Sequence, residues 1–231
     1  MRFIVNFMMF FSLVNAAAAG PWTREEHQLF YATGGNFLLS DGAQLPVNYD
    51  PTFYAEYGLN GTVTLGTDYH TADQGRIQAA VIFMGFPLGE TNGRDVWSAH
   101  IGLGGRVDPL NPVEYLTRGG VSWGRGLDTG WLAVDASATY GNIDQVFRPK
   151  ADVTWGRRLT DRWTTIMQLQ TGEGFEDDQY IKINPAITFR FNDKYTLSLG
   201  AVHAFTGDRG SALKLDLWTT TTIPQFGRAN E

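Results

Sequence analysis

The chain has 231 residues, with 18 Lys and Arg against 24 Asp and Glu, so its formal net charge is -6. This acidic balance argues against nucleic acid as a partner. The chain contains no cysteine, which excludes disulfide bonds, thiolate metal ligands and cysteine nucleophiles.

The first 19 residues have the layout of a cleaved secretory signal. Arg2 supplies a positive charge, residues 3–14 form an apolar run, and Ala17, Ala18 and Ala19 give the small residues that precede a cleavage site. The run is too short for a membrane-spanning helix, which needs roughly 20 apolar residues. We therefore expect residues 1–19 to be removed on export and residues 20–231 to form one domain.

Beyond this signal, the alternation of side chains and the spacing of turn residues predict twelve strands. Turn residues such as Asn60-Gly61, Asp128-Thr129-Gly130 and Asn192-Asp193 separate them. The predicted strands cover residues 27–38, 51–59, 62–71, 76–87, 96–107, 115–126, 130–140, 146–158, 162–172, 179–191, 195–206 and 211–221.

The segment from 179 to 191 shows the alternation most clearly. Ile181, Ile183 and Ile187 fall on one parity, and Lys182 and Arg190 fall on the other. One face is therefore apolar and the other charged, as in a strand between lipid and a wet interior. Since no later apolar stretch is long enough for a helical span, we predict an all-β fold: a transmembrane antiparallel up-and-down β-barrel of about twelve strands in the bacterial outer membrane.

The lengths of the connections predict the topology. Those after the second, sixth, eighth and tenth strands are short, whereas residues 40–50, 108–114 and 172–178 are longer. Short periplasmic turns and longer outer loops are typical of such barrels, so we expect both chain ends in the periplasm. The connection at 88–95 is an exception, because it is long although it lies at the end that is predicted to carry the short periplasmic turns.

Aromatic residues lie near both ends of the predicted strands, on the apolar parity. Two belts of rings are expected at the two membrane interfaces and not in a soluble sandwich. The belt beside the short turns contains Tyr57, Trp97, Trp123, Trp155, Trp163, Phe191 and Tyr195, and the opposite belt contains Phe53, Tyr69, Tyr115, Tyr140, Phe147 and Phe205.

The hairpin EYGLNGTVTLG at 56–66 resembles an element of Gram-negative outer-membrane β-barrels. It is similar to one in the transporter-like family linked to the meta-pathway of phenol degradation. The resemblance implies a barrel and passive transport, and it transfers no binding residue. One departure is the tail after Trp218, because such barrels usually stop at an aromatic residue on the last strand.

The charged residues on the wet parity predict what the lumen contains. Eight are basic and five acidic, so the lumen is predicted to be net positive and to favour anions. Alternatively, Asp135, Asp152 and Asp216 neutralise the cations in a structural network that fills the barrel. The predicted lumen-lining residues are Glu56, Asp68, His70, His100, Arg106, Arg118, Asp135, Arg148, Lys150, Asp152, Arg158, Lys182, Arg190, Lys214 and Asp216.

Enzymatic chemistry has weak support in the sequence. Ser98 and His100 share a strand face, but no third group orients them. Asp68 and His70 supply only half of a proteolytic constellation, and the four histidines lack ligand spacing. We therefore predict no catalytic residues, no metal site and no cofactor. The acidic loop at 173–178 is either a solvated outer loop or a site for cations that bridge lipopolysaccharide.

These observations predict an outer-membrane barrel that acts as a narrow passive channel for small polar or anionic solutes. The alternative is a non-conducting structural or surface-interaction barrel with a salt-bridged interior, and a barrel lipid hydrolase is a third possibility. The expected partners are outer-membrane lipid, lipopolysaccharide, the barrel-assembly machinery and small anionic solutes, with no nucleic acid.

Overall fold

The computed structural model describes residues 20–39, 49–72, 75–91, 93–109, 111–174, 178–207 and 210–223. In this part of the chain no helix is long and apolar enough to cross a membrane. All twelve predicted strands are confirmed, with ends within a few residues of the predicted ones. They are β1 Gln28–Leu39, β2 Tyr49–Gly58, β3 Thr64–Ala72, β4 Ile77–Pro87, β5 Asp95–Asp108, β6 Asn111–Leu127, β7 Gly130–Gly141, β8 Phe147–Arg158, β9 Trp163–Glu173, β10 Gln179–Arg190, β11 Tyr195–Thr206 and β12 Ser211–Thr222.

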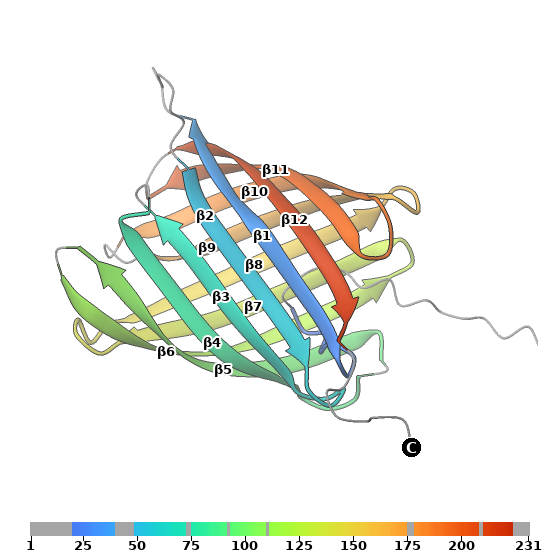
Figure 1. Cartoon of the computed structure of the whole chain (residues 1–231), viewed down its shortest axis with the longest axis horizontal. Coiled ribbons are helices and arrows are strands. Elements are labelled where there is room, and N and C mark those ends of the chain that lie inside the picture. The colour runs from blue at the N-terminus through green and yellow to red at the C-terminus, as the bar shows by residue number, and fades with distance from the viewer. Residues whose placement is uncertain are drawn as a thin grey trace, which may run out of the picture.

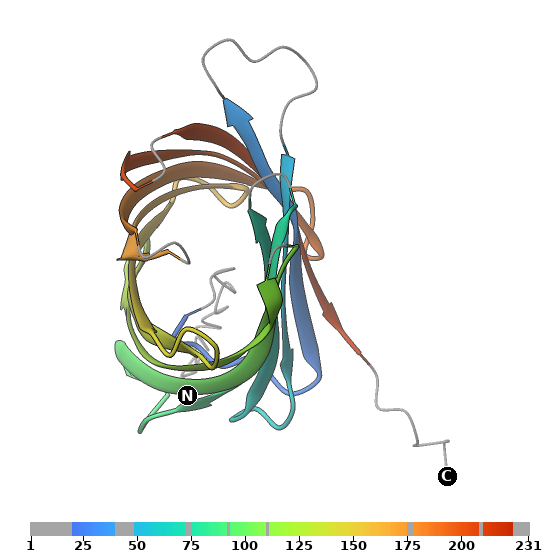
Figure 2. The same ribbon diagram turned by 90° about the vertical axis from the view of Figure 1, so that its left-hand side faces the viewer.

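The strands form one closed antiparallel barrel in which each strand pairs with its neighbours in sequence (Figures 1 and 2). The first and last strands complete the ring through pairing that runs from Gln28 opposite Thr222 to Leu39 opposite Ser211. Closure leaves no strand edge, which is the condition for strands to cross lipid. The start of β1 and the finish of β12 lie at the same end of the barrel, which we name the terminal end; the other is the far end.

Short turns at the terminal end are fixed by side-chain hydrogen bonds. In the turn between β2 and β3, Asn60 Oδ1 accepts the Val63 N–H at 2.9 Å, and Gly61 has a φ of 72°, which favours glycine. Asn192 repeats this arrangement between β10 and β11, where its Oδ1 accepts the Tyr195 N–H at 2.9 Å. The predicted turn residues thus define where these strands stop.

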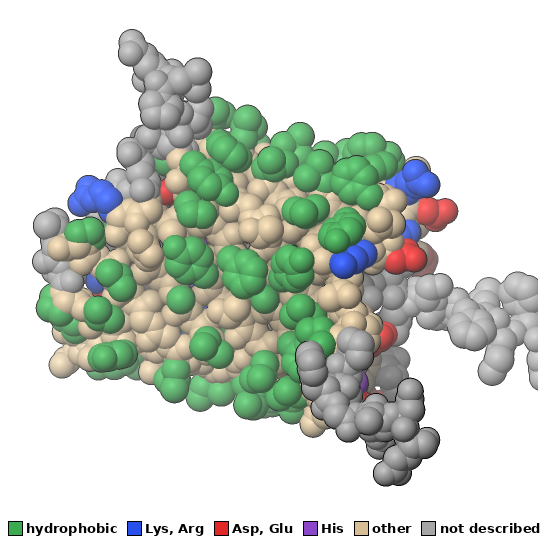
Figure 3. Space-filling view, in the orientation of Figure 1, with side chains coloured by type: hydrophobic (Ala, Val, Ile, Leu, Met, Phe, Trp, Pro, Cys, Tyr) green, Lys and Arg blue, Asp and Glu red, His purple; other side chains and the backbone are tan. Residues whose placement is uncertain are grey.

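The outer wall of the barrel is apolar. Ile82 and Leu103, which face each other on neighbouring strands, are both 67% exposed, and Leu199 is also exposed. Figure 3 shows hydrophobic side chains spread over the visible wall and most charged ones near its ends. A wall of large exposed apolar side chains is stable only against lipid, so this barrel spans a membrane.

The predicted aromatic belts lie at the two rims of this wall. Near the terminal end, the rings of Trp97 and Trp123 are 6.4 Å apart. Near the far end, those of Tyr140 and Phe147 are 4.8 Å apart. Both pairs join neighbouring strands on the outer face, where the rings reach the headgroup level.

One predicted connection is wrong. Residues 108–114 were expected to form a long loop, but β5 continues to Asp108 and β6 begins at Asn111, leaving only residues 109 and 110 between the strands. The pairing continues because Arg106 and Glu114 face each other across the hairpin and form an ion pair of 3.0 Å. The other predicted long connections lie partly or wholly outside the described residues, as do the signal segment 1–19 and the tail from residue 224.

Candidate functional site: the barrel lumen

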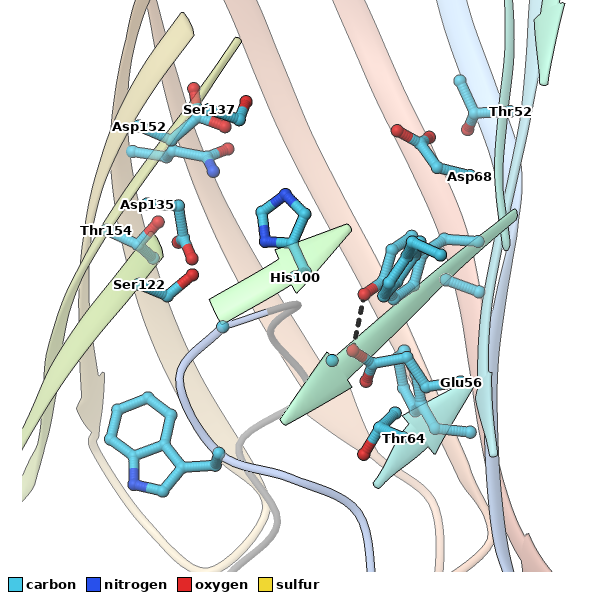
Figure 4. A pocket seen from close by; sticks show the side chains of 18 of the residues that line it. Thr52, Glu56, Thr64, Asp68, His100, Ser122, Asp135, Ser137, Asp152 and Thr154 are labelled. Carbon is cyan, nitrogen blue, oxygen red and sulfur yellow. Dashed lines mark hydrogen bonds between the residues drawn. The ribbon is translucent and has the colours of Figure 1, made fainter. Parts of the chain in front are cut away.

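The barrel encloses a cavity of about 390 Å³ to which all twelve strands contribute (Figure 4). Its position follows from the alternation of side chains, which directs every second residue of each strand inward. A cavity of this size suits a small molecule.

Ten of the fifteen predicted lumen residues line this cavity. They are Glu56, Asp68, His70, His100, Arg118, Asp135, Lys150, Asp152, Lys214 and Asp216.

The other five predicted residues lie outside the central cavity. Arg106 pairs with Glu114 at the far end, and Arg148 forms an ion pair with Asp144 there. Arg158 and Arg190 end their strands at the terminal end. Lys182 lies over the ring of Tyr180, 4.5 Å from its centroid.

The charge of the cavity differs from the predicted basic excess. Five carboxylates line it, but only three basic groups do: Arg118, Lys150 and Lys214. The predicted excess of basic residues is not found in the central cavity, because the remaining basic residues lie toward the strand ends. The parity of a residue does not reveal its height along the strand.

Three ion pairs neutralise much of this charge. Arg118 on β6 reaches Asp68 on β3 at 2.8 Å, across the inner faces of β4 and β5. The other two join residues two positions apart on one strand: Lys150 with Asp152 at 2.9 Å, and Lys214 with Asp216 at 3.8 Å.

The predicted structural network therefore forms in part. Asp152 and Asp216 are members of it, but Asp135 makes no ion pair with any described residue and instead hydrogen-bonds Ser122.

The two strand-local pairs present their cations to the cavity. The Lys150 side chain is 46% exposed and that of Asp152 is 12% exposed. The same order holds for Lys214 at 32% and Asp216 at 8%. The carboxylates lie against the wall, so the ammonium groups are the more accessible charges to a solute.

A row of rings covers the inner wall from β1 to β5. Ring centroids are 6.3 Å apart for Phe30 and Tyr54, 6.0 Å for Tyr54 and Phe83, and 6.0 Å for Phe83 and His100. Phe83 extends over β3 because Gly66 has no side chain; a Cβ there would lie 2.1 Å from the ring. We did not predict this row, although its signal is present: Phe30, Tyr54 and Phe83 are aromatic residues on the wet parity.

The segment before β1 enters the barrel at the terminal end. Trp22 and Thr23 line the cavity and Pro21 is fully buried. Two glycines of the wall make room for it. A Cβ on Gly124 would lie 2.3 Å from Pro21, and one on Gly58 would lie 1.9 Å from the Glu25 carbonyl oxygen.

Arg24 anchors this segment to the wall. Its guanidinium pairs with Glu56 at 2.5 Å and lies 4.4 Å from the ring centroid of Phe30. Its backbone N–H donates to Thr64 Oγ1 at 2.9 Å. Glu56 also accepts the Tyr54 hydroxyl at 2.6 Å, the bond drawn in Figure 4. Strand periodicity could not predict this contact, because Arg24 lies outside every predicted strand.

At the far end, Asp144 lies in the turn between β7 and β8. Partial burial raises its pKa, but hydrogen bonds from Arg148 and from the Val146 N–H outweigh burial and leave the pKa below its ordinary value. The carboxylate therefore stays ionised and holds Arg148 at the rim of the barrel.

Groups that could support catalysis are not assembled in the described part of the chain. Ser98 and His100 both line the cavity, yet no hydrogen bond joins them; His100 packs against Phe83 instead. Asp68 is paired with Arg118. Among the described residues, no group of three His, Asp or Glu side chains is placed to hold a metal ion.

A closed twelve-strand ring, an apolar wall with two aromatic belts and a polar interior define a transmembrane β-barrel of the bacterial outer-membrane type. No protein-family model and no curated sequence matches this chain.

Solved structures with this fold include outer-membrane channels. The KdgM porin aligns with a TM-score of 0.60 and 7% identity over 83% of this chain and 98% of the porin. The COG4313 outer membrane channel from Pseudomonas putida F1 aligns with a TM-score of 0.59 and 9% identity over 89% of this chain and 98% of the channel. A second KdgM structure, in complex with disordered oligogalacturonate, aligns with a TM-score of 0.57 and 8% identity over 83% and 98%. At these identities the likeness shows a shared fold.

Proposed function

We propose that this barrel is a narrow passive channel through the outer membrane for small polar solutes, anions included. The observation that carries the proposal is the cavity itself, to which all twelve strands contribute inside a wall that faces lipid. Hydrogen-bonding groups inside a barrel lower the cost of moving a polar solute across the hydrocarbon layer.

Three features make the channel narrow. The ring row covers one wall, the pair of Arg118 and Asp68 extends across two strands, and the segment around Trp22 fills part of the terminal end. A solute that passes must be small or must thread through in an extended form.

Two observations favour anions. Lys150 and Lys214 are more exposed to the cavity than the carboxylates with which they pair. In addition, a structure with the same fold is a porin in complex with an oligogalacturonate, which is a polyanion. Exposed ammonium groups in a low-dielectric barrel raise the local concentration of anions.

The proposal extends to how the protein reaches the outer membrane and what surrounds it there. Residues 1–19 would export it, the barrel-assembly machinery would insert it, and lipopolysaccharide would surround the far end. It also includes a relationship to the transporter-like family linked to the meta-pathway of phenol degradation, supported by the hairpin at 56–66, which forms the β2–β3 turn.

The alternative is a non-conducting barrel, favoured by the buried segment that Arg24 anchors and by the paired charges. Single-channel recording in planar bilayers separates the two. The channel predicts discrete conductance and an anion-selective reversal potential in a salt gradient. Folded, inserted protein that passes no current would refute the channel and support the structural barrel.

The selectivity has its own test. Replacing Lys150 and Lys214 together by glutamine should shift the reversal potential toward cation preference, because the carboxylates of Asp152 and Asp216 then lose their partners. Arg94→Gln is the matched control, since this side chain is highly exposed in the connection between β4 and β5. An unchanged reversal potential in the double variant would exclude these lysines as the selective groups.

A further inference from the structure

Five basic side chains gather on one arc of the terminal end, from the end of β8 to the start of β11. We name this set the basic arc; it consists of Arg157, Arg158, Arg162, Arg190 and Lys194. Figure 1 shows the turns of these strands at the end where β12 finishes.

Backbone hydrogen bonds hold the turns of the basic arc side by side. The Arg190 N–H donates to the Arg162 carbonyl at 2.9 Å, the Arg158 N–H donates to the Thr129 carbonyl at 2.8 Å, and the Thr220 N–H donates to the Lys194 carbonyl at 2.9 Å. Thr160 Oγ1 accepts the Trp163 N–H at 3.1 Å and closes the turn that carries Arg162. The backbone positions of these residues are therefore set by the fold.

The five cations of the basic arc outnumber the two carboxylates of its turns, Asp161 and Asp193. None of its five cationic groups forms an ion pair with a carboxylate of a described residue. Arg190 donates to the backbone carbonyl of Asp161 at 2.5 Å, and Lys194 lies over the ring of Tyr195. By contrast, on another arc of the terminal end Arg94 pairs with Asp128, and Arg125 pairs with Asp95.

The aromatic belt places this arc at the depth of the lipid headgroups. Trp155, Trp163 and Tyr195 are exposed on the outer wall. Arg157 follows Trp155 by two residues on the same face, roughly 7 Å further toward the rim at about 3.3 Å per residue. An arginine at this depth can extend its guanidinium to the interface, whereas nearer the midplane it would be costly.

We propose that the basic arc binds the phosphate of an anionic glycerophospholipid in the leaflet at the terminal end. Arg157 approaches from the lipid side, and Arg162 and Lys194 approach from the turns. The guanidinium group of an arginine can donate two hydrogen bonds to the oxygens of one phosphate. The net positive charge of the basic arc favours an anionic over a zwitterionic headgroup. The site is separate from the lumen, so this proposal holds whether or not the barrel conducts.

The test measures lipid retained by the full-length folded barrel in a non-ionic detergent. Native mass spectrometry is used to titrate phosphatidylglycerol and phosphatidylethanolamine with identical acyl chains. Arg157→Gln with Arg162→Gln is the test variant, and Arg94→Gln with Arg125→Gln is the matched control from another arc of the same end. Folding of each variant is checked by the heat-dependent shift in gel mobility.

We expect the parent and the control to prefer phosphatidylglycerol, and the test variant to lose roughly tenfold or more of that preference. Added salt should weaken the binding. Equal retention of both lipids by the parent would overturn the proposal, as would a test variant that matches the parent. Displacement of the lipid by soluble glycerol phosphate at a similar concentration would show that a free phosphate is the ligand and would also overturn it.

Discussion

Ala136 and Ser137 are neighbours in the middle of β7 that face opposite environments. Ala136 is exposed on the outer wall, and Ser137 lines the cavity. Both are small, so the same replacement tests the environment rather than the size of the side chain. Ala136→Arg should lower the free energy of unfolding by about 2–4 kcal/mol, because it places a charge in the apolar band. Ser137→Arg should cost far less.

Folding titrations in lipid vesicles measure both values. Equal destabilisation at the two positions would contradict the inside and outside faces of β7.

The same alternation explains which lumen residues could be predicted from sequence. Parity decides which face of a strand a residue occupies, so ten of the fifteen predicted residues line the cavity. Parity says nothing of height along the barrel, so Arg158 and Arg190 were included although they lie at the strand ends. Parity also does not predict which side chains of different strands contact each other. The ring row depends on such a contact, because Phe83 packs over Gly66 of the neighbouring strand.

At the scale of elements, the segment before β1 lies inside the terminal end of the lumen. Arg24 and Glu56 anchor it, and Gly124 makes the space for Pro21 and Trp22. Gly124→Val should expel the segment without altering any charge, because the added atoms would overlap Pro21. Arg24→Ala should release it by breaking a buried pair, at a cost of about 3–5 kcal/mol in stability.

Single-channel conductance should therefore rise in both variants, while Gly126→Val, which lies on the same strand and has open space around its Cβ, should leave it unchanged. Parent-like conductance in both lumen variants would mean that this segment does not form the constriction.

Strands and turns were predictable here because lipid on one side and water on the other impose a two-residue period over many residues. The hairpin between β5 and β6 was the exception. Its residues 108–114 contain two prolines and were predicted to form a long loop. The ion pair between Arg106 and Glu114 and the pairing of Asp108 with Asn111 instead extend the ladder. Local turn propensity was outweighed by contacts across the hairpin. The position of the segment before β1 inside the lumen was not predicted for a different reason: its side chains show no regular alternation.

At the scale of the whole molecule, the even number of strands puts the start of β1 and the finish of β12 at one end, and an exported chain should keep that end in the periplasm. The chain has no cysteine, so single cysteines report its topology without background. Ile143, exposed in the turn between β7 and β8 at the far end, is one site. Asp193, in the turn between β10 and β11 at the terminal end, is the other.

On intact cells, an impermeant thiol reagent should label Ile143→Cys and spare Asp193→Cys, and disruption of the outer membrane should expose the second site. The basic arc would then face the phospholipid leaflet, and the anchored segment would narrow the periplasmic mouth. Labelling of Asp193→Cys alone on intact cells would mean that the barrel has the opposite orientation. The basic arc would then lie among the phosphates of lipopolysaccharide.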